Sequence, residues 1–386
     1  MLSGHRRAPL SELCSFLNGN GFRPTDWKPS GLPIIRIQNL NGSEIFNYFD
    51  GEVRDEWIVE PGDLLFAWAG VKGVSFGPTI WPGPKGVLNQ HIYRVVPNKG
   101  VDRYWLYAAL RLVTSRIEAQ AHGFKSSLVH VHKEDITGQM VELPPLMEQR
   151  KIAEILRAWD EAIEKTEALL RAAQDHHDAY SRSFFKPCHP SPGGCGSNWS
   201  DFSMGELFRE RDEPGAESDV LLSITMSGGV IDRDGVGRKD SSSEDKTKYK
   251  LVLPGDIGYN TMRMWQGVSG LSSLRGIVSP AYTVLIPKQD KIFPRYAAHL
   301  FKSRRMIHDF ERYSQGLTSD TWNLKYPVFA EIKVSLPSIV LQEQQANFLD
   351  AMNEEISVIT RQRDALAVQK RGLMQKLLTG EWRVKC

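Results

Sequence analysis

The sequence predicts an α+β protein in which two similar mixed α/β domains lie at opposite ends of an antiparallel two-helix coiled coil, related by approximate two-fold symmetry. Three observations lead to this prediction. The chain of 386 residues contains one pattern twice, each copy mixes short strand-like runs with a helical segment, and each copy ends in a long heptad stretch. A chain of this length also exceeds one typical hydrophobic core, which favours two domains.

The internal repeat has a spacing of 193 residues, half of the chain length. The tripeptide Pro-Gly-Asp at 61–63 recurs at 254–256, and each copy is followed by an apolar, strand-like run. Gly123 recurs as Gly316, and the Leu-Pro pair at 143–144 recurs at 336–337. Each match alone is weak, but their shared offset and order indicate two copies of one fold.

Each copy reads as a mixed α/β domain followed by a long helix. Short β-rich runs bounded by Gly, Pro and Asn predict strands at Pro33–Gln38, Asp63–Ala69, His91–Val96 and Gln139–Leu143. Apolar residues near helical spacing predict a helix over Arg103–Ala121, with Gly123 suited to its C-terminal cap. The second copy repeats this order and ends with a strand at Ile332–Leu336.

The predicted boundaries follow from these elements and from the breaks between them. The first domain covers residues 1–146, its long helix 147–185, the second domain 201–340, its long helix 341–378, and a tail 379–386. Residues 186–200 are rich in Pro, Gly and Ser, as expected of an exposed linker.

The two long helices carry a heptad seam in the same register once shifted by 193 residues. A seam this long favours mutual pairing, although two amphipathic helices packed on their own domains remain the alternative. Because the second helix must run back from the second domain, the pair is antiparallel, and some 36 residues span roughly 50–55 Å. The predicted interface residues are Ile152, Leu156, Trp159, Ile163, Leu170, Tyr180, Leu349, Met352, Ile356, Ile359, Leu366, Leu373 and Leu377. The polar seam residues, which either set the register or extend to solvent at the seam's edge, are Thr166, His177, Arg363 and Lys370.

Composition narrows the function classes. The net charge is only +2, so the strong basic excess of many nucleic-acid proteins is missing. No apolar run is long enough for an ordinary membrane span, and the first residues lack a signal core, so we expect a cytoplasmic protein with free thiols. Cys188, His189 and Cys195 lack a nearby fourth ligand, so we expect no metal site there.

Known enzyme motifs do not explain the sequence. Residues 73–77 spell GVSFG, but Pro78 follows at once, whereas a nucleophile elbow needs a strand turning into a helix. Gly19-Asn20-Gly21 is only half of a dinucleotide fingerprint, and no phosphate-binding loop sequence occurs. No Asp/Asn-Pro-Pro-Tyr/Phe motif of an amino-methyltransferase is found, and Glu331-Ile332-Lys333 is better explained by a strand than by a nuclease. We therefore expect no catalytic site and no cofactor in this chain.

With these features together, the chain resembles the specificity subunits of type I restriction–modification systems along nearly its whole length. The motifs are LPPLMEQRKIAEIL at 143–156, LPSIVLQEQQANFL at 336–349 and the closing MQKLLTGEWRV at 374–384. One departure is that Glu343-Gln344 follows two residues later than Glu148-Gln149 predicts, which suggests a local difference where the second helix begins.

The resemblance implies a division of labour between subunits. In the family, each domain reads one half of a bipartite double-stranded DNA target, and the helices dock two methyltransferase subunits. S-adenosylmethionine and ATP are expected to be bound by partner subunits, and restriction subunits join the complex. Such partners can supply many phosphate contacts, which agrees with the modest charge of this chain.

Base reading needs polar side chains that reach base edges, so we expect the DNA-binding residues in equivalent loops of both copies. The candidates in the first copy are Arg36, Gln38, Asn39, Trp68, Lys72, Asn89, Gln90, His91, Lys125 and Ser126. Those in the second copy are Thr225, Ser227, Asn260, Arg263, Trp265, Gln266, Ser279, Ser319, Asp320, Trp322 and Asn323. Arg23 and Lys28 face either phosphate or solvent, and His130 and His132 read as a strand edge more than as metal ligands.

Two other function classes stay open at this point. The first is a nuclease or methyltransferase whose catalytic motif has diverged. The second is a coiled-coil adaptor whose end domains bind proteins or glycans.

Overall fold

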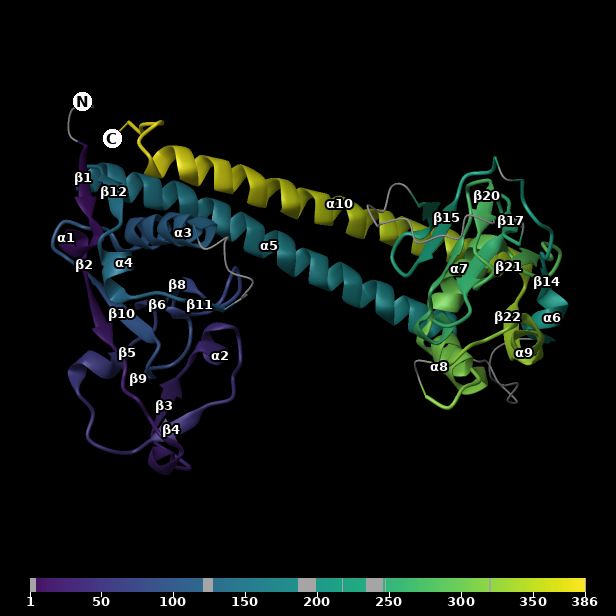
Figure 1. The fold of residues 1–386 in the computed structure, drawn as a ribbon, viewed down its shortest axis with the longest axis horizontal. Helices are drawn as coiled ribbons and strands as arrows, with labels where there is room; N and C mark the ends of the chain where they lie inside the picture. The colour runs from purple at the N-terminus through teal and green to yellow at the C-terminus, as the bar shows by residue number, and fades with distance from the viewer. Residues whose placement is uncertain are drawn as a thin grey trace. The chain divides into compact units, whose positions relative to one another are not determined.

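The structure is a computed structural model that describes residues 5–120, 128–186, 199–216, 218–233, 246, 248–318 and 321–385. It divides into two compact units (Figure 1). Unit 1 comprises Met1–Glu167 and Arg361–Cys386, and unit 2 comprises Ala168–Thr360. Each unit therefore contains part of both long helices.

Unit 1 begins with the α/β domain and continues into the first long helix. Its strands are β1 (Arg6–Pro9), β2 (Cys14–Asn18), β3 (Leu32–Ile35), β4 (Asn47–Phe49), β5 (Ile58–Val59), β6 (Leu64–Ala67), β7 (Ala69–Val71), β8 (Gly77–Ile80), β9 (Gly86–Leu88), β10 (Ile92–Pro97), β11 (Leu128–His130) and β12 (Met140–Leu143). Its helices are α1 (Leu10–Leu13), η1 (Pro24–Asp26), α2 (Ile37–Leu40), η2 (Asp55–Trp57), α3 (Arg103–Gln120), α4 (Lys133–Thr137) and the start of α5 (Leu146–Phe184).

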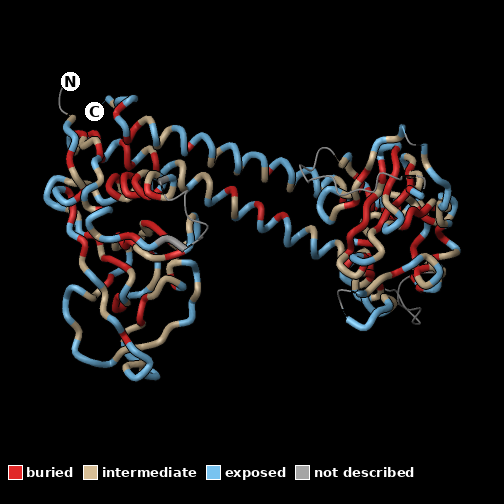
Figure 2. The backbone as a smooth tube through the Cα atoms, viewed as in Figure 1, coloured by how far each residue is buried: buried red, intermediate tan, exposed pale blue. Residues whose placement is uncertain are grey.

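Two four-stranded sheets form the frame of unit 1. One has the order β2-β10-β6-β8 and is antiparallel throughout, and the other has the order β4-β3-β9-β5 with β3 parallel to β9. Strand β1 pairs with β12, so the start of the domain is fastened to the strand that precedes α5. The main core contains Phe66 from the first sheet and the fully buried Trp105 from α3. Figure 2 shows that α3 is one of the most buried segments of unit 1.

Unit 2 repeats this plan. Its strands are β13 (Trp199–Ser203), β14 (Phe208–Glu210), β15 (Leu222–Thr225), β16 (Gly229–Asp232), β17 (Lys250–Val252), β18 (Ile257–Asn260), β19 (Ser269–Leu271), β20 (Gly276–Val278), β21 (Tyr282–Pro287) and β22 (Lys333–Pro337). Its helices are α6 (Met204–Leu207), η5 (Met264–Gln266), α7 (Pro294–Lys302), α8 (Arg304–Tyr313), α9 (Tyr326–Glu331) and the first half of α10 (Ile339–Leu378).

The order β14-β21-β18-β19 in unit 2 corresponds to β2-β10-β6-β8 in unit 1, and β13–β22 corresponds to β1–β12. The second sheet is divided into the pairs β15–β16 and β17–β20, joined by a parallel bridge between Leu221 and Ile277. The repeat seen in the sequence is thus a repeat of topology, and the predicted mixed α/β fold class is confirmed.

Two predicted elements differ from the structure. Strand β3 ends at Ile35, short of the predicted Gln38, and α2 begins at Ile37. The cause is Asn39, whose side chain accepts a hydrogen bond from the Arg36 amide and donates to the carbonyls of Ser43 and Ile45, which winds a helical turn. In unit 2 the counterpart of α3 is split into α7 and α8, because Ser303 is extended and its hydroxyl caps the amide of Met306.

The long helices pack against each other within each unit. In unit 1, Ile152 and Leu156 of α5 share a core with Leu377 of α10, and in unit 2, Leu170 of α5 clusters with Ile359 of α10. Residue numbers rise along α5 as they fall along α10, so the packing is antiparallel within each unit. The predicted antiparallel pairing is confirmed to this extent.

Most of the other predicted seam residues are partly buried, and Leu349 is fully buried. The partly buried residues are Trp159, Ile163, Met352, Ile356, Leu366 and Leu373. Tyr180 is 45% exposed, and its ring packs edge-to-face on Phe348 with the centroids 4.8 Å apart. Lys370, a polar seam residue, is buried and pairs with Asp160, which also accepts a hydrogen bond from Tyr104. This buried pair fits the register-setting alternative for Lys370 better than a side chain extended to solvent.

A buried glutamine near the start of each long helix ties that helix to its domain. In unit 1, Gln149 donates to the carbonyls of Pro144 and Gly100 and accepts from the amide of Asp102, at 2.9, 3.3 and 2.8 Å. The turn that precedes α3 and the strand that precedes α5 are thereby joined through one side chain.

Unit 2 repeats this arrangement with Gln342. Its amide donates to the carbonyls of Pro337 and Lys291 and accepts from the amide of Phe293, at 2.9, 3.2 and 2.9 Å. Gln342 stands 193 residues after Gln149, and both side chains are 1% exposed. The motif is therefore not shifted by two residues, because the counterpart of Gln149 is Gln342, whereas Gln344 is exposed.

The residue before each glutamine does differ. Glu148 is buried in unit 1 and binds Arg383 from the C-terminal tail and His5 near the N-terminus, whereas its counterpart is Leu341. Burial by itself would raise the pKa of Glu148, but the hydrogen bonds from Arg383 and His5 outweigh it and lower the pKa below the usual value. Both ends of the described chain are thus held at the start of α5.

We predict that Gln342→Ala lowers the free energy of unfolding by about 2–3 kcal/mol, because three hydrogen bonds of about 1 kcal/mol each are removed. Gln344→Ala, on the exposed side of the same helix, should change it by less than about 0.5 kcal/mol. Urea denaturation followed by circular dichroism measures both. Equal effects of the two variants would contradict the assigned register.

We also predict that Leu170→Asp destabilises unit 2 by at least about 3 kcal/mol, because loss of a buried Leu side chain alone costs about 2–5 kcal/mol and a carboxylate enters its place. The neighbouring Leu169 is 54% exposed, so Leu169→Asp serves as the matched control. The unfolding temperatures of the two variants show whether Leu170 is buried in the seam or lies on a helix face exposed to solvent. A Leu170→Asp variant as stable as its control would rule out this packing.

Candidate nucleic-acid interface

A groove of about 650 Å³ on unit 2 collects residues from three separate segments of the chain. These are the end of β15 with its turn, the end of β18 with η5, and the start of β21. Five of the predicted DNA-binding residues line it, namely Thr225, Ser227, Asn260, Arg263 and Gln266. The remaining lining residues, which the sequence did not single out, are Ser223, Ile224, Met226, Val268 and Tyr282.

Local hydrogen bonds shape the walls of this groove. The Thr225 hydroxyl accepts from the amide of Gly228, which closes the turn between β15 and β16. The Asn260 side-chain oxygen accepts from the amide of Met262, which starts the turn after β18. Met264 is fully buried and anchors η5, while Gly267 ends it in the left-handed region at φ 78°.

Arg263 and Gln266 flank the buried Met264 on η5. Arg263 is exposed and Gln266 is partly buried. Within the described residues, neither side chain has a hydrogen-bond or ion-pair partner. Arginine and glutamine are side chains that bind base edges through paired hydrogen bonds, so this pair has the chemistry of direct base readout.

The other candidates of unit 2 lie outside this groove. Trp265 packs edge-to-face on Trp322 with the centroids 5.4 Å apart, and its indole donates to the carbonyl of Met262. The Ser279 hydroxyl accepts from the amide of Ala281, and the Asn323 side chain donates to the carbonyl of Gln315. These contacts give Trp265, Ser279 and Asn323 a structural role. Ser319 and Asp320 lie outside the described residues.

Unit 1 presents an aromatic cluster around Trp68. The ring lies 4.9 Å from that of His91 and 4.8 Å from that of His130, both edge-to-face, and stacks on Tyr93 at 5.9 Å. The buried indole nitrogen of Trp68 has no hydrogen-bond partner among the described residues. Two of the four members, Trp68 and His91, were predicted from the sequence. His130 lies on β11, paired with Ala69, as the predicted strand edge requires.

His91 adopts a strained backbone conformation. Its φ of 75° lies in the left-handed region and is the one positive value at a non-glycine residue in the described part of the chain. Such conformations cost free energy and persist where the surroundings fix them, which is common at binding sites. Asn89 and Gln90 lead directly into this residue, and the Asn89 side-chain oxygen is buried with no partner among the described residues.

The remaining candidates of unit 1 are mostly engaged within the fold. The Arg36 guanidinium lies 4.4 Å above the ring of Trp27, and Asn39 holds the turn described above. Gln38 donates to the carbonyl of Ile45, and the Lys72 ammonium donates to the carbonyl of Glu118. Lys125 and Ser126 lie outside the described residues.

The GVSFG segment is a turn. It joins β7 to β8, and the Ser75 hydroxyl accepts a hydrogen bond from the amide of Val71 at 2.7 Å. No helix follows it, so the strand-to-helix geometry of a nucleophile elbow is not formed. Burial raises the pKa of the Cys14 thiol to about 12, which makes it a poor nucleophile.

Within the described ranges, no group of three or more metal-binding side chains is found, and no helix is long and apolar enough to cross a membrane. The Cys188, His189 and Cys195 segment lies outside these ranges.

Sequence comparisons give a consistent set of relatives. Residues 7–171 match the family model described as a type I restriction modification DNA specificity domain. The type I restriction enzyme MjaVIII specificity subunit of Methanocaldococcus jannaschii is 25% identical over 363 residues, which cover 86% of this chain and 81% of that protein. The type I restriction enzyme EcoBI specificity subunit of Escherichia coli is 26% identical over 167 residues, 42% of this chain and 34% of that protein.

The fold agrees with these relatives. A crystal structure of a type I restriction–modification system S subunit from M. genitalium matches with a TM-score of 0.61 at 16% identity, covering 98% of this chain and 97% of the other. The chain is similar to type I specificity subunits over most of its length, and the resemblance predicted from the sequence is thus confirmed. Specificity subunits are the non-catalytic recognition subunits of these systems, which agrees with the prediction that this chain is not an enzyme.

The sequence missed functional candidates whose roles depend on tertiary contacts. Tyr93 lies on β10, where alternation predicted only a strand, yet its ring joins the cluster of Trp68. A second, strongly basic pocket of unit 2 was also missed, because its cations come from two segments far apart in the chain. In the sequence, this pocket is indicated only by the basic residues within 182–186 and 302–305.

We predict that a fluorophosphonate probe does not label Ser75, because its hydroxyl is held by the amide of Val71 and no elbow geometry supports it. Mass spectrometry of the treated chain measures the modification. Labelling at Ser75 that disappears in a Ser75→Ala variant would restore the hydrolase interpretation of the GVSFG segment.

Proposed function

We propose that this chain is the sequence-specific DNA-binding subunit of a type I restriction–modification complex, with each unit reading one half of a bipartite duplex target. The observation that carries the proposal is the groove of unit 2. Five polar residues predicted from sequence as base readers, coming from separate segments, meet there on one concave surface.

The chemistry of the groove suits base edges. The Arg263 guanidinium can donate two parallel hydrogen bonds to guanine, and the Gln266 amide can both donate to and accept from adenine. Thr225 and Asn260 use oxygen atoms to hold the groove's turns, so the floor stays fixed while Arg263 and Gln266 are free to bind. Because the turns of the groove are already fixed before DNA binds, little additional conformational entropy is lost on binding.

In unit 1 we propose that Trp68 and His91, with the adjacent Asn89 and Gln90, form the corresponding reading surface. The strained backbone of His91 and the unpartnered polar atoms of Trp68 and Asn89 support this assignment among the described residues. Because the side chains differ from those of the unit 2 groove, the two half-sites should differ in sequence.

We also propose that two methyltransferase subunits dock on the long helices and that restriction subunits join through them. Large apolar side chains of α5 and α10 support this, since they are exposed in the described chain: Met147, Leu169, Val340, Val358 and Val368. S-adenosylmethionine and ATP would then be held by the partner subunits, with no cofactor in this chain.

The test is selection of bound duplexes from a random-sequence pool by the full-length chain with its methyltransferase partners. We predict two constrained segments separated by an unconstrained gap. Arg263→Ala should relax one or two positions in one segment only, and discrimination should fall by about 1–3 kcal/mol for each base that the side chain no longer binds. The exposed Lys333, outside the groove, gives the control Lys333→Ala. A pool without any constrained position would contradict the proposed function and favour a protein- or glycan-binding adaptor.

A further inference from the structure

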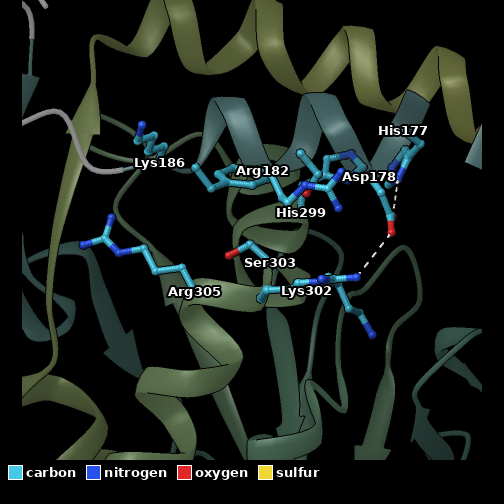
Figure 3. Close-up of a pocket in the computed structure, with 11 residues that line it drawn as sticks. His177, Asp178, Arg182, Lys186, His299, Lys302, Ser303 and Arg305 are labelled. Carbon is cyan, nitrogen blue, oxygen red and sulfur yellow. Dashed lines mark ion pairs between the residues drawn. The ribbon is translucent and has the colours of Figure 1, made fainter. Parts of the chain in front are cut away.

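A second pocket of unit 2, of about 360 Å³, lies between the C-terminal end of α5 and the junction of α7 with α8 (Figure 3). Five cationic side chains line it. Arg182 and Lys186 come from α5 or directly follow it, and Lys302, Arg304 and Arg305 come from the α7–α8 junction. We call this pocket the basic cradle.

Carboxylates lie within ion-pair distance of two of these five cations. Asp178 is the one carboxylate among the lining residues, and it lies 3.9 Å from the Arg304 guanidinium and 3.7 Å from the His177 ring. Arg305 lies 4.0 Å from Asp309. Arg182 and Lys186 have no ion-pair partner within the described residues. The cradle is therefore suited to an anion that brings several negative charges.

The cations near the end of α5 have an alternative explanation, because positive side chains stabilise the C-terminal end of a helix dipole. That explanation also applies to Lys302, the last residue of α7, but not to Arg304 or Arg305. Arg304 and Arg305 stand in the first turn of α8, where a positive charge opposes the helix dipole. Their position is unfavourable for the fold alone and favourable when a phosphate neutralises them.

The cradle adjoins the groove described above. The Lys302 ammonium, which lines the cradle, donates to the carbonyl of Met226 at 2.7 Å, and Met226 lines the groove. Both pockets belong to unit 2, so one ligand can contact them together. A duplex whose base edges enter the groove carries its phosphates along the groove's rim.

We propose that the basic cradle binds backbone phosphates of the DNA beside the half-site read by unit 2. This inference rests on the proposed function and adds to it a second class of contact, which positions the duplex without reading its sequence. Arginine suits the task because its planar fork matches phosphate oxygens.

The corresponding place in unit 1 is also basic. A shift of 193 residues places His177, Asp178 and Ser181 on Lys370, Arg371 and Met374, and these three line a pocket of unit 1 together with Arg111. Lys370 is neutralised by Asp160, which leaves Arg111 and Arg371 as the cations there. Of the five cradle cations, only Arg304 has a cation 193 residues away, namely Arg111, so the recurrence is limited to this arginine.

The experiment measures binding of the full-length chain, together with its methyltransferase partners, to two labelled duplexes over a series of KCl concentrations. One duplex has a random sequence and the other comes from the selection above. The variants are Arg182→Gln with Lys186→Gln, and Arg304→Gln with Arg305→Gln. Arg209→Gln with Lys333→Gln removes two exposed cations outside both pockets and serves as the matched control.

Each cradle variant should weaken binding of both duplexes by the same factor, about tenfold. The slope of log K against log salt should fall by about 0.9 for each phosphate that the variant no longer binds. The preference for the selected duplex should stay unchanged, and phosphate ethylation beside one half-site should no longer interfere with binding. The control should keep the wild-type slope.

Wild-type slopes and affinities in both cradle variants would overturn the inference. If such variants also lost a methyltransferase subunit, the cradle would be a protein-binding site instead. A changed preference between the two duplexes would also overturn it, because the cradle would then read bases. Failure of the proposed function has a different signature: the wild-type chain itself would bind both duplexes equally.

Discussion

The attachment of each long helix to its domain depends on one buried glutamine side chain. Gln149 joins the end of the strand before α5 to the turn before α3, and Gln342 joins the end of the strand before α10 to the turn before α7. Each side chain binds two carbonyls and one amide that would otherwise be buried without partners. A glutamine has the donors and the acceptor that this junction needs in one group. The same three contacts in both units fix which face of the helix meets its partner, and the apolar seam follows from that face.

On this shared scaffold, equivalent backbone positions carry different side chains. The amide of Trp68 donates to the carbonyl of His91, and in unit 2 the amide of Thr261 donates to the carbonyl of Ala281 in the same place. The backbone is the same, but an aromatic cluster stands in one unit, and small side chains beside an Arg–Gln groove stand in the other. The hydrogen bonds of the sheet keep the geometry, so the surface can vary without loss of the fold.

The two pockets of unit 2 divide the contacts that a duplex offers. The groove presents polar groups suited to base edges, and the basic cradle presents cations suited to phosphates. The Lys302–Met226 hydrogen bond links the groove to the cradle, so a change in the turn after β15 would alter the geometry of both pockets. Affinity and specificity would thus come from adjacent but distinct parts of one unit.

The sequence by itself determined the repeat, the mixed α/β class, the long helices and their seam, because these depend on periodic patterns and on local signals such as Pro and Gly. It also found five residues of the groove, since polar residues after strands are a local signal. It could not assign to Asn39 the turn that its side-chain amide holds, nor to Gln342 its role, because the partners of Gln342 lie up to 51 residues away. Only the tertiary structure brought Arg182 and Lys186 to Arg304 and Arg305, because helices distant in sequence meet through packing, and no pattern along the chain records which charges then become neighbours.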